Sequence, residues 1–312
     1  MQHFMHTSAN ATWQTRIRRL IDEHRCHSVY LDVGSNIGVQ IRKLYEPSLY
    51  VGRDPKLASL ARRFKLYDEP TAEEVAAGIV TKGRAFWNST SQVLPVFEQY
   101  FGTQPRCGVC AIGVEPNPRH TERLRTVETA LRAAGFGVLW LRETAADVYS
   151  GFTTIKYKGC VSCGGKKVND VGLRTPRDGS GLPVGLHSTR VATIDLAMLI
   201  HFVHRHLHKG RGGKIVMKLD TEGAEEWLLP HLIARHALCV PDLLFLEWHP
   251  DPPPHGTAEL REARRRTLEA VKQPNCTTVV STIDDETFFF DGKPLPTERS
   301  CHAGVRAQVA AS

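Results

Sequence analysis

A short apolar run, a glycine turn and a helical pattern follow one another near the N-terminus, and this succession restricts the chain to few folds. Residues 28–33 (SVYLDV) form a β-rich run that ends at Gly34. After it, apolar residues recur at helical spacing from Ile37 to Tyr45. A strand that passes through a glycine turn into a helix is typical of β-α-β units. We therefore expect a parallel sheet whose first strand is residues 28–33.

The same alternation recurs along the chain. Further strands are predicted at residues 109–114 (VCAIGV), 138–141, 214–219 (KIVMKL) and 243–248. Helical patterns cover residues 13–24 and 259–271 and also follow most of these runs. Residues 277–283 and 287–290 are expected to form a terminal hairpin. The pattern predicts an α/β fold, with a mostly parallel sheet, one antiparallel strand and helices on both faces.

Two segments depart from this alternation. Residues 47–105 contain helical pieces at 57–64, 71–77 and 92–100 but no strong strand, so we interpret them as an insertion. Residues 150–187 are rich in Gly, Lys and Pro, and we expect a long loop that orders over a ligand. The predicted organisation is an N-terminal helical extension (1–27), one domain (28–298) and a flexible tail (299–312).

Composition excludes several classes of protein. The 312 residues are 41% hydrophobic and 23% charged, which argues against a disordered or fibrous chain. No apolar run reaches the roughly 18 residues that a membrane-spanning helix needs. The first 25 residues lack an apolar segment, so no cleavable signal is expected. The net charge of +7 fits either a nucleic-acid partner or an anionic small molecule.

The eight cysteines allow more than one interpretation. A chain of this length can fold without disulfides, so we expect reduced thiols and a cytoplasmic location. Two C-x-x-C pairs suggest zinc, but they lie about 50 residues apart, which is too far for a usual zinc ribbon. The pairs are Cys107 with Cys110 and Cys160 with Cys163. Three N-x-[ST] sequons, at Asn10, Asn88 and Asn275, are compatible with a location in the secretory pathway.

The turn after the first strand has the form D-x-G-x-x-x-G. Gly34 permits a tight turn and a close backbone approach, and Gly38 lets the following helix pack near the strand. Asp32 can hold a cationic amine or a ribose hydroxyl, and the helix N-terminus can face an anion. The spacing is not the one that accommodates a pyrophosphate, and a ligand with one carboxylate and one ammonium, such as the methionine part of S-adenosylmethionine, suits it better. The alternative is a glycine turn without a cofactor.

A ribose-binding acid is expected at the tip of the second strand. Asp54 has the usual spacing of about 20 residues, but Arg53 interrupts its short run. Glu115 comes much later, yet it ends a true apolar run and precedes a helix. We therefore predict Glu115 as the ribose-binding acid and Asp54 as part of a loop.

Five motifs in this order resemble the FkbM family of S-adenosylmethionine-dependent methyltransferases, over roughly residues 28–250. They are DVGSNIG (32–38), VEPNP (114–118), TID (193–195), KLDTEGAE (218–225) and LEWH (246–249). The resemblance implies a Rossmann-like seven-stranded sheet in the order 3-2-1-4-5-7-6. It also implies O-methylation of a hydroxyl on a sugar, a glycan or a small metabolite.

The resemblance also implies roles for particular residues. Asp220 at the end of the fourth strand and Glu247 with His249 at the end of the fifth are the expected catalytic residues, with Asp220 or His249 as the base. Glu143 to Ala145, after the third strand, are expected near the adenine. The full set of expected cofactor-binding residues is Asp32, Gly34, Asn36, Gly38, Glu115, Asn117, Glu143 and Asp220.

The acidic turn after the fourth strand leaves alternatives open. Glu222 and Glu225 are expected to bind acceptor hydroxyls or to orient the turn, but carboxylates also cap helix N-termini. Asp220, Glu222 and Glu247 could bridge a divalent metal, although we predict none.

Two other functions compete with O-methylation. An RNA methyltransferase would use the basic residues, but Arg261, Arg264, Arg265 and Arg266 fit a solvated helix face, and no N-P-P-Y-like tetrapeptide follows the fourth strand. The second competing function is that of a non-catalytic binding module that has kept only the fold. We expect a small-molecule or glycan partner rather than nucleic acid, and the oligomeric state stays open.

Overall fold

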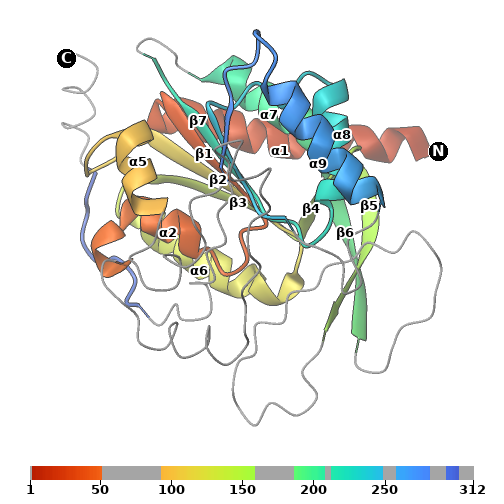
Figure 1. Cartoon of the computed structure of the whole chain (residues 1–312). Helices are drawn as coiled ribbons and strands as arrows, with labels where there is room; N and C mark the ends of the chain where they lie inside the picture. Colours follow the sequence, from red (N-terminus) through yellow and green to blue (C-terminus); the bar gives the residue numbers. More distant parts are fainter. Residues whose placement is uncertain are drawn as a thin grey trace, which may run out of the picture.

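A computed structural model describes residues 2–50, 93–158, 186–207, 212–248, 258–281 and 293–301. Its central sheet contains six parallel strands in the order β3-β2-β1-β7-β8-β9 (Figure 1). All residues of β1, β2, β7 and β8 are buried, as expected where helices cover both faces. The strands are β1 (Ser28–Val33), β2 (Val109–Glu115), β3 (Gly137–Arg142), β7 (Ile215–Leu219), β8 (Leu243–Leu246) and β9 (Val279–Ser281).

The sheet confirms the α/β class but corrects the predicted strand count and order. β9 pairs directly with β8, and it is parallel, with Val279 opposite Leu243. Within the described residues, no seventh strand separates these two, as the order 3-2-1-4-5-7-6 would require. The predicted hairpin partner, residues 287–290, lies outside the described residues.

Helices cover both faces of this sheet (Figure 1). Side chains alternate along each strand, so that Val29 and Leu31 join one core whereas Tyr30 joins the other. The first core is covered by α1 (Gln2–His24), α7 (Leu196–His206) and α8 (Glu225–Ala234), with α9 (Ala258–Val271) packed on α8. The second is covered by α2 (Val39–Tyr45), α5 (Val93–Phe101) and α6 (Thr121–Ala133). Short 3-10 helices occupy Pro47–Tyr50 and Pro118–His120.

The N-terminal helix is part of the domain rather than an extension of it. Trp13, Ile17, Leu20 and Ile21 of α1 are buried in the first core. Helix α1 also contacts α7 and strands β2 and β3. The boundary predicted at residue 27 therefore does not separate two structural units.

A second sheet was missed in the sequence. It contains β4 (Thr144–Asp147), β6 (Leu186–Asp195) and β5 (Gly151–Lys158), in that order. β5 and β6 pair antiparallel from Gly151 opposite Thr193 to Lys158 opposite Leu186. Both ends of the segment predicted as a loop, 150–187, are therefore strands, and residues 159–185 between them lie outside the described residues.

The six cysteines within the described ranges are paired, which contradicts the expectation of reduced thiols. Cys107 and Cys110, expected as one C-x-x-C unit, belong to two different disulfides. Within the described ranges, no three or more His, Cys, Asp or Glu side chains are grouped so as to hold a metal ion. The second pair, Cys160 and Cys163, is outside these ranges. The disulfides are Cys26–Cys110, Cys107–Cys301 and Cys239–Cys276.

Residues 299–301, predicted as the start of a flexible tail, are held against the domain. The backbone N–H groups of Ser300 and Cys301 both donate to the carbonyl of Ala134 at 3.0 Å. The guanidinium of Arg42 donates to the carbonyl of Lys293, upstream in the same segment, at 3.2 Å. The described C-terminal segment is therefore part of the fold.

Among the described helices, none is both long enough and apolar enough to cross a membrane.

Candidate functional site

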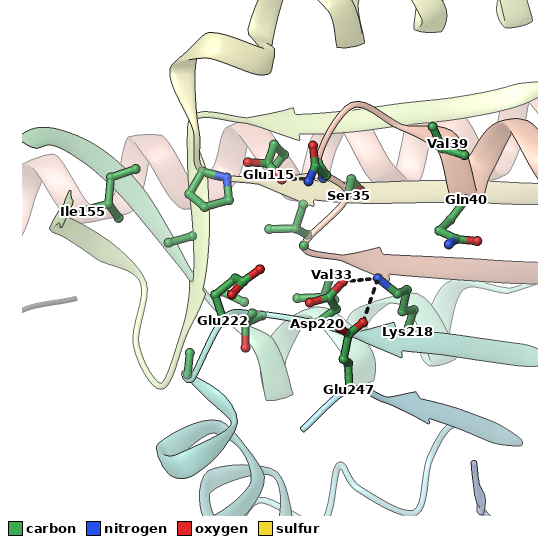
Figure 2. A pocket seen from close by; sticks show the side chains of 18 of the residues that line it. Val33, Ser35, Val39, Gln40, Glu115, Ile155, Lys218, Asp220, Glu222 and Glu247 are labelled. Atoms are coloured by element: carbon green, nitrogen blue, oxygen red, sulfur yellow. Dashed lines mark hydrogen bonds and ion pairs between the residues drawn. The ribbon is translucent and has the colours of Figure 1, made fainter. Parts of the chain in front are cut away.

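A pocket opens at the carboxyl edge of the central sheet (Figure 2). It encloses ≈ 920 Å³ of space, part of it open to solvent. Its walls come from the ends of β1, β2, β7 and β8 and from Ala145, Ala146 and Ile155 of the second sheet. Ligands of open parallel sheets bind at this edge. The second sheet, absent from our prediction, thus forms a wall of the pocket.

The glycine turn after β1 connects that strand to the end of β7. Gly34 has φ +87°, and a Cβ there would lie 1.7 Å from the carbonyl oxygen of Asp220. The N–H of Asp220 donates to the carbonyl of Val33 at 3.0 Å. Gly34 thus permits a close approach, but the group it approaches is the backbone of Asp220, and the predicted approach to a ligand stays a prediction. Gly38 similarly lets α2 pack on β3, because a Cβ there would lie 2.9 Å from the ring of Trp140.

Glu115 is fixed at the tip of β2 by two backbone N–H groups. One carboxylate oxygen accepts from the N–H of Asn36 at 2.6 Å, and the other accepts from the N–H of Asn117 at 2.8 Å. Glu115 is buried and lines the pocket, as does Asn36. The side chain of Asn117, predicted to bind the cofactor, instead accepts from the N–H of Arg119 and caps the 3-10 helix behind the turn, and it does not line the pocket. Glu115 thus joins the turns after β1 and β2.

A buried lysine stands among three carboxylates. The ammonium of Lys218 on β7 donates to Asp220 and lies 3.9 Å from Glu247 (Figure 2). Asp32 on the neighbouring β1 interacts electrostatically with the same ammonium. Lys218 is 6% exposed and lines the pocket with Asp220 and Glu247. The positive charge that a bridging metal would supply between Asp220 and Glu247 is therefore supplied by Lys218.

The charges of this cluster have opposite effects on two pKa values. Burial alone lowers the pKa of Lys218, but the carboxylates of Asp220, Glu247 and Asp32 outweigh it, so this pKa lies above its ordinary value. Burial raises the pKa of Asp32 to about 6, against the attraction of Lys218. Lys218 is thus protonated at neutral pH, whereas Asp32 changes its charge close to neutral pH.

The raised pKa of Asp32 predicts a specific pH dependence. Because folded Asp32 keeps its proton up to about pH 6 while the unfolded side chain loses it near pH 3.8, stability falls as pH rises through this interval. Relative to the Asp32→Asn variant, the wild-type free energy of unfolding should fall by about 2 kcal/mol between pH 4 and pH 6. Urea denaturation of both proteins at steps across this range measures the difference. Parallel pH profiles would contradict the assignment.

The acidic turn after β7 contains two glutamates with different roles. Glu225 is fully buried, and its carboxylate accepts from the N–H groups of Thr221 at 2.7 Å and Gly223 at 2.8 Å. It therefore orients the turn, one of the two roles expected for it, and does not line the pocket. Glu222 has φ 54° and lines the pocket.

Three oxygen atoms near or in the pocket have no hydrogen-bond donor among the described residues. They are Oδ2 of Asp32, Oδ1 of Asn36 and Oε1 of Gln40. Buried acceptors without donors are rare and usually indicate a missing partner. Asn36 and Gln40 line the pocket, so a ligand with N–H or O–H groups could supply their partners.

The structure brings together part of the predicted site. Of the expected cofactor-binding and catalytic residues, those that line the pocket are Gly34, Asn36, Glu115, Asp220 and Glu247. Asp32 and Gly38 lie behind the wall, and His249 is outside the described residues. Glu143 is not in the wall, and its carboxylate instead accepts from the hydroxyl of Thr121 at 3.0 Å.

Sequence reasoning missed several pocket residues. Gln40, Trp227 and Ile155 carry no distinctive local signal. Lys218 does carry one, because a lysine inside the apolar run KIVMKL is a charge in a strand expected to be buried.

Comparison with family models, with curated proteins and with solved structures found no match to this chain. The function of the site is therefore argued from its geometry and from the motifs that it contains.

Proposed function

We propose that this chain is an S-adenosylmethionine-dependent methyltransferase that methylates a hydroxyl group. The observation that carries the proposal is the acidic pocket at the carboxyl edge of the sheet, with Glu115 fixed at the tip of β2. Among the described residues, its lining contains the ammonium of Lys218 and four carboxylates, those of Glu115, Asp220, Glu222 and Glu247. Such a lining favours a cationic ligand over a phosphate group.

The residues present fit this cofactor. Oε2 of Glu115 accepts one backbone N–H, from Asn36, and keeps a lone pair for a ribose hydroxyl, whereas Oε1 accepts from Asn117 and lies 3.3 Å from Nδ1 of His120. The donor-free oxygens of Asn36 and Gln40 suit the ammonium or hydroxyl groups of the same ligand. The acceptor-rich wall therefore matches a ligand that has donors and a positive charge.

Methyl transfer from this cofactor requires few catalytic groups from the protein. S-adenosylmethionine, when bound, supplies a methyl group that is already activated. The side chains must then hold the acceptor in line and receive the proton of its hydroxyl. Asp220 and Glu247 can accept that hydrogen bond, and Lys218 fixes both carboxylates. His249 stays the predicted alternative base.

The acceptor is proposed to be a sugar, a glycan or a small metabolite. The basic helix α9 supports an RNA acceptor poorly, because Arg265 is engaged by Glu262 at 2.8 Å and by Glu269 at 2.5 Å on the same helix. Arg264 lies over the ring of Trp248 at 5.2 Å.

Transfer of a labelled methyl group tests the proposal. The full chain with labelled S-adenosylmethionine should label a carbohydrate or metabolite fraction and leave RNA unlabelled. Asp220→Asn should lower turnover about 100-fold or more, because the acceptor hydroxyl loses a charged partner, while cofactor binding persists. Glu143→Gln, outside the pocket wall, is the matched control and should keep wild-type turnover. Label in RNA alone, or Asp220→Asn turnover equal to wild type, would contradict this proposal.

A further inference from the structure

The three disulfides lie at the edge of the sheet opposite the pocket. Cys26 stands before β1, Cys239 stands before β8, and Cys276 stands before β9. Cys107 and Cys110 flank the start of β2. Since the strands are parallel, all these positions lie at the amino ends, whereas the pocket lies at the carboxyl ends. The disulfides therefore hold the fold and take no part in the pocket.

The pairing indicates an oxidising compartment. The partners are separated by 84, 194 and 37 residues, yet their Cα atoms lie 5.7, 5.5 and 5.0 Å apart, within the range of ordinary disulfides. None of the described cysteines is left free. Cytosolic chains are kept reduced, so three such pairs point to maturation outside the reducing cytosol. Each pair forms when two thiols give up two protons and two electrons to a disulfide-bearing oxidant, which becomes a dithiol.

One sequon lies beside one of these disulfides. In Asn275-Cys276-Thr277, the outer two side chains are exposed, whereas Cys276 is half-buried and bonded to Cys239. Thr278, the next residue, is buried and donates to the carbonyl of Pro241 at 2.6 Å. Asn275 lies in a turn, in which the N–H of Cys276 donates to the carbonyl of Gln273 at 2.9 Å, and Thr277 follows in the irregular stretch before β9. Both sequon side chains are therefore open to solvent beside the disulfide. An accessible N-x-[ST] segment of this kind is the acceptor for N-linked glycans.

We propose that the chain matures in the oxidising secretory route and that Asn275 carries an N-linked glycan there. The Nδ2 atom of Asn275 bonds to the anomeric carbon of an oligosaccharide donated by a lipid pyrophosphate. The bond from that carbon to the pyrophosphate breaks, the lipid pyrophosphate leaves with the electron pair, and the amide gives up one proton. The glycan projects from the amino edge of the sheet and leaves the pocket open. This inference does not depend on the proposed enzymatic activity.

Thiol trapping and glycan release on the full chain from its own cells test both parts. Free thiols are blocked before reduction and new thiols are labelled after it, and the peptides are then identified by mass spectrometry. The six described cysteines should carry the second label alone. The Asn275 peptide should appear as aspartate after enzymatic glycan release and should be absent in unmodified form before release.

Sequon variants separate glycosylation from folding. Thr277→Ala should lose the glycan and Thr277→Ser should keep it, because the hydroxyl of the third sequon residue is required while Asn275 is unchanged in both. Neither variant touches a residue of the pocket. Cysteines that take up the first label, or an unmodified Asn275 peptide in the wild-type chain, would each overturn the inference.

Discussion

Replacement of Lys218 by methionine is expected to lower the free energy of unfolding by about 3 to 5 kcal/mol at pH 7.5, because removal of one partner of a buried ion pair leaves uncompensated buried charge. Methionine has nearly the length of lysine, so little packing volume is lost. The ammonium serves Asp220, Glu247 and Asp32, and the site is 6% exposed. Urea denaturation measures the change through the transition midpoint at constant slope.

Lys214→Met is the matched control at the other end of the same strand region. Lys214 also pairs with a carboxylate, Asp242 at 2.8 Å, but its side chain is 44% exposed. A surface pair of this kind contributes about 1 kcal/mol or less, so the control should lose little stability. The effect of Lys218→Met should also shrink at pH 5, because the pKa of Asp32 is about 6 and its protonated form leaves less uncompensated charge. Equal small losses in both variants would contradict the role given to Lys218.

Replacement of Glu115 by glutamine is expected to raise the Kd for S-adenosylmethionine by about 10- to 100-fold, the loss expected when hydrogen bonds to a charged group are weakened or removed. Glutamine keeps one oxygen, but its NH₂ group would face the N–H of Asn36 or of Asn117. The turns after β1 and β2 would then lose their shared acceptor. Titration calorimetry measures the affinity.

Glu143→Gln controls for the loss of one carboxylate near the same strand ends. Because Glu143 does not line the pocket, its Kd should equal the wild-type value. A urea midpoint for Glu115→Gln separates weaker binding from partial unfolding. Unchanged affinity in a folded Glu115→Gln protein would remove Glu115 from the cofactor site.

The sequence predicted the central strands well, for a physical reason. Residues 28–33 and 109–114 are apolar runs that end at a glycine or an acid, and a fully buried parallel strand has few other possible patterns. The ends of the runs 28–33, 109–114 and 214–219 located Gly34, Glu115 and Asp220 at the carboxyl edge of the sheet. All three residues line one pocket. The sequence did not show which strand β9 pairs with, because a strand of three residues carries no pattern that identifies its partner.

The second sheet and the disulfides could not be inferred in the same way. β5 (GFTTIKYK) mixes polar and apolar residues, and the long polar stretch that follows it has a composition that predicts a loop. Its place depends on pairing with β6, from Lys158 opposite Leu186 to Gly151 opposite Thr193, and no local pattern shows such a distant pairing. Cys107 and Cys110 stand three residues apart but bond to Cys301 and Cys26, because strand geometry rather than spacing decides which thiols meet.

Titration of the full wild-type chain with S-adenosylmethionine tests the proposed function most directly. Saturable binding of one molecule per chain is expected, with a Kd within the range of about 1 μM to 1 mM that is usual for enzyme substrates. Bound cofactor should also raise the urea midpoint, since a ligand of the folded state stabilises it. No saturable heat up to about 1 mM ligand, together with an unchanged midpoint, would contradict a methyltransferase pocket.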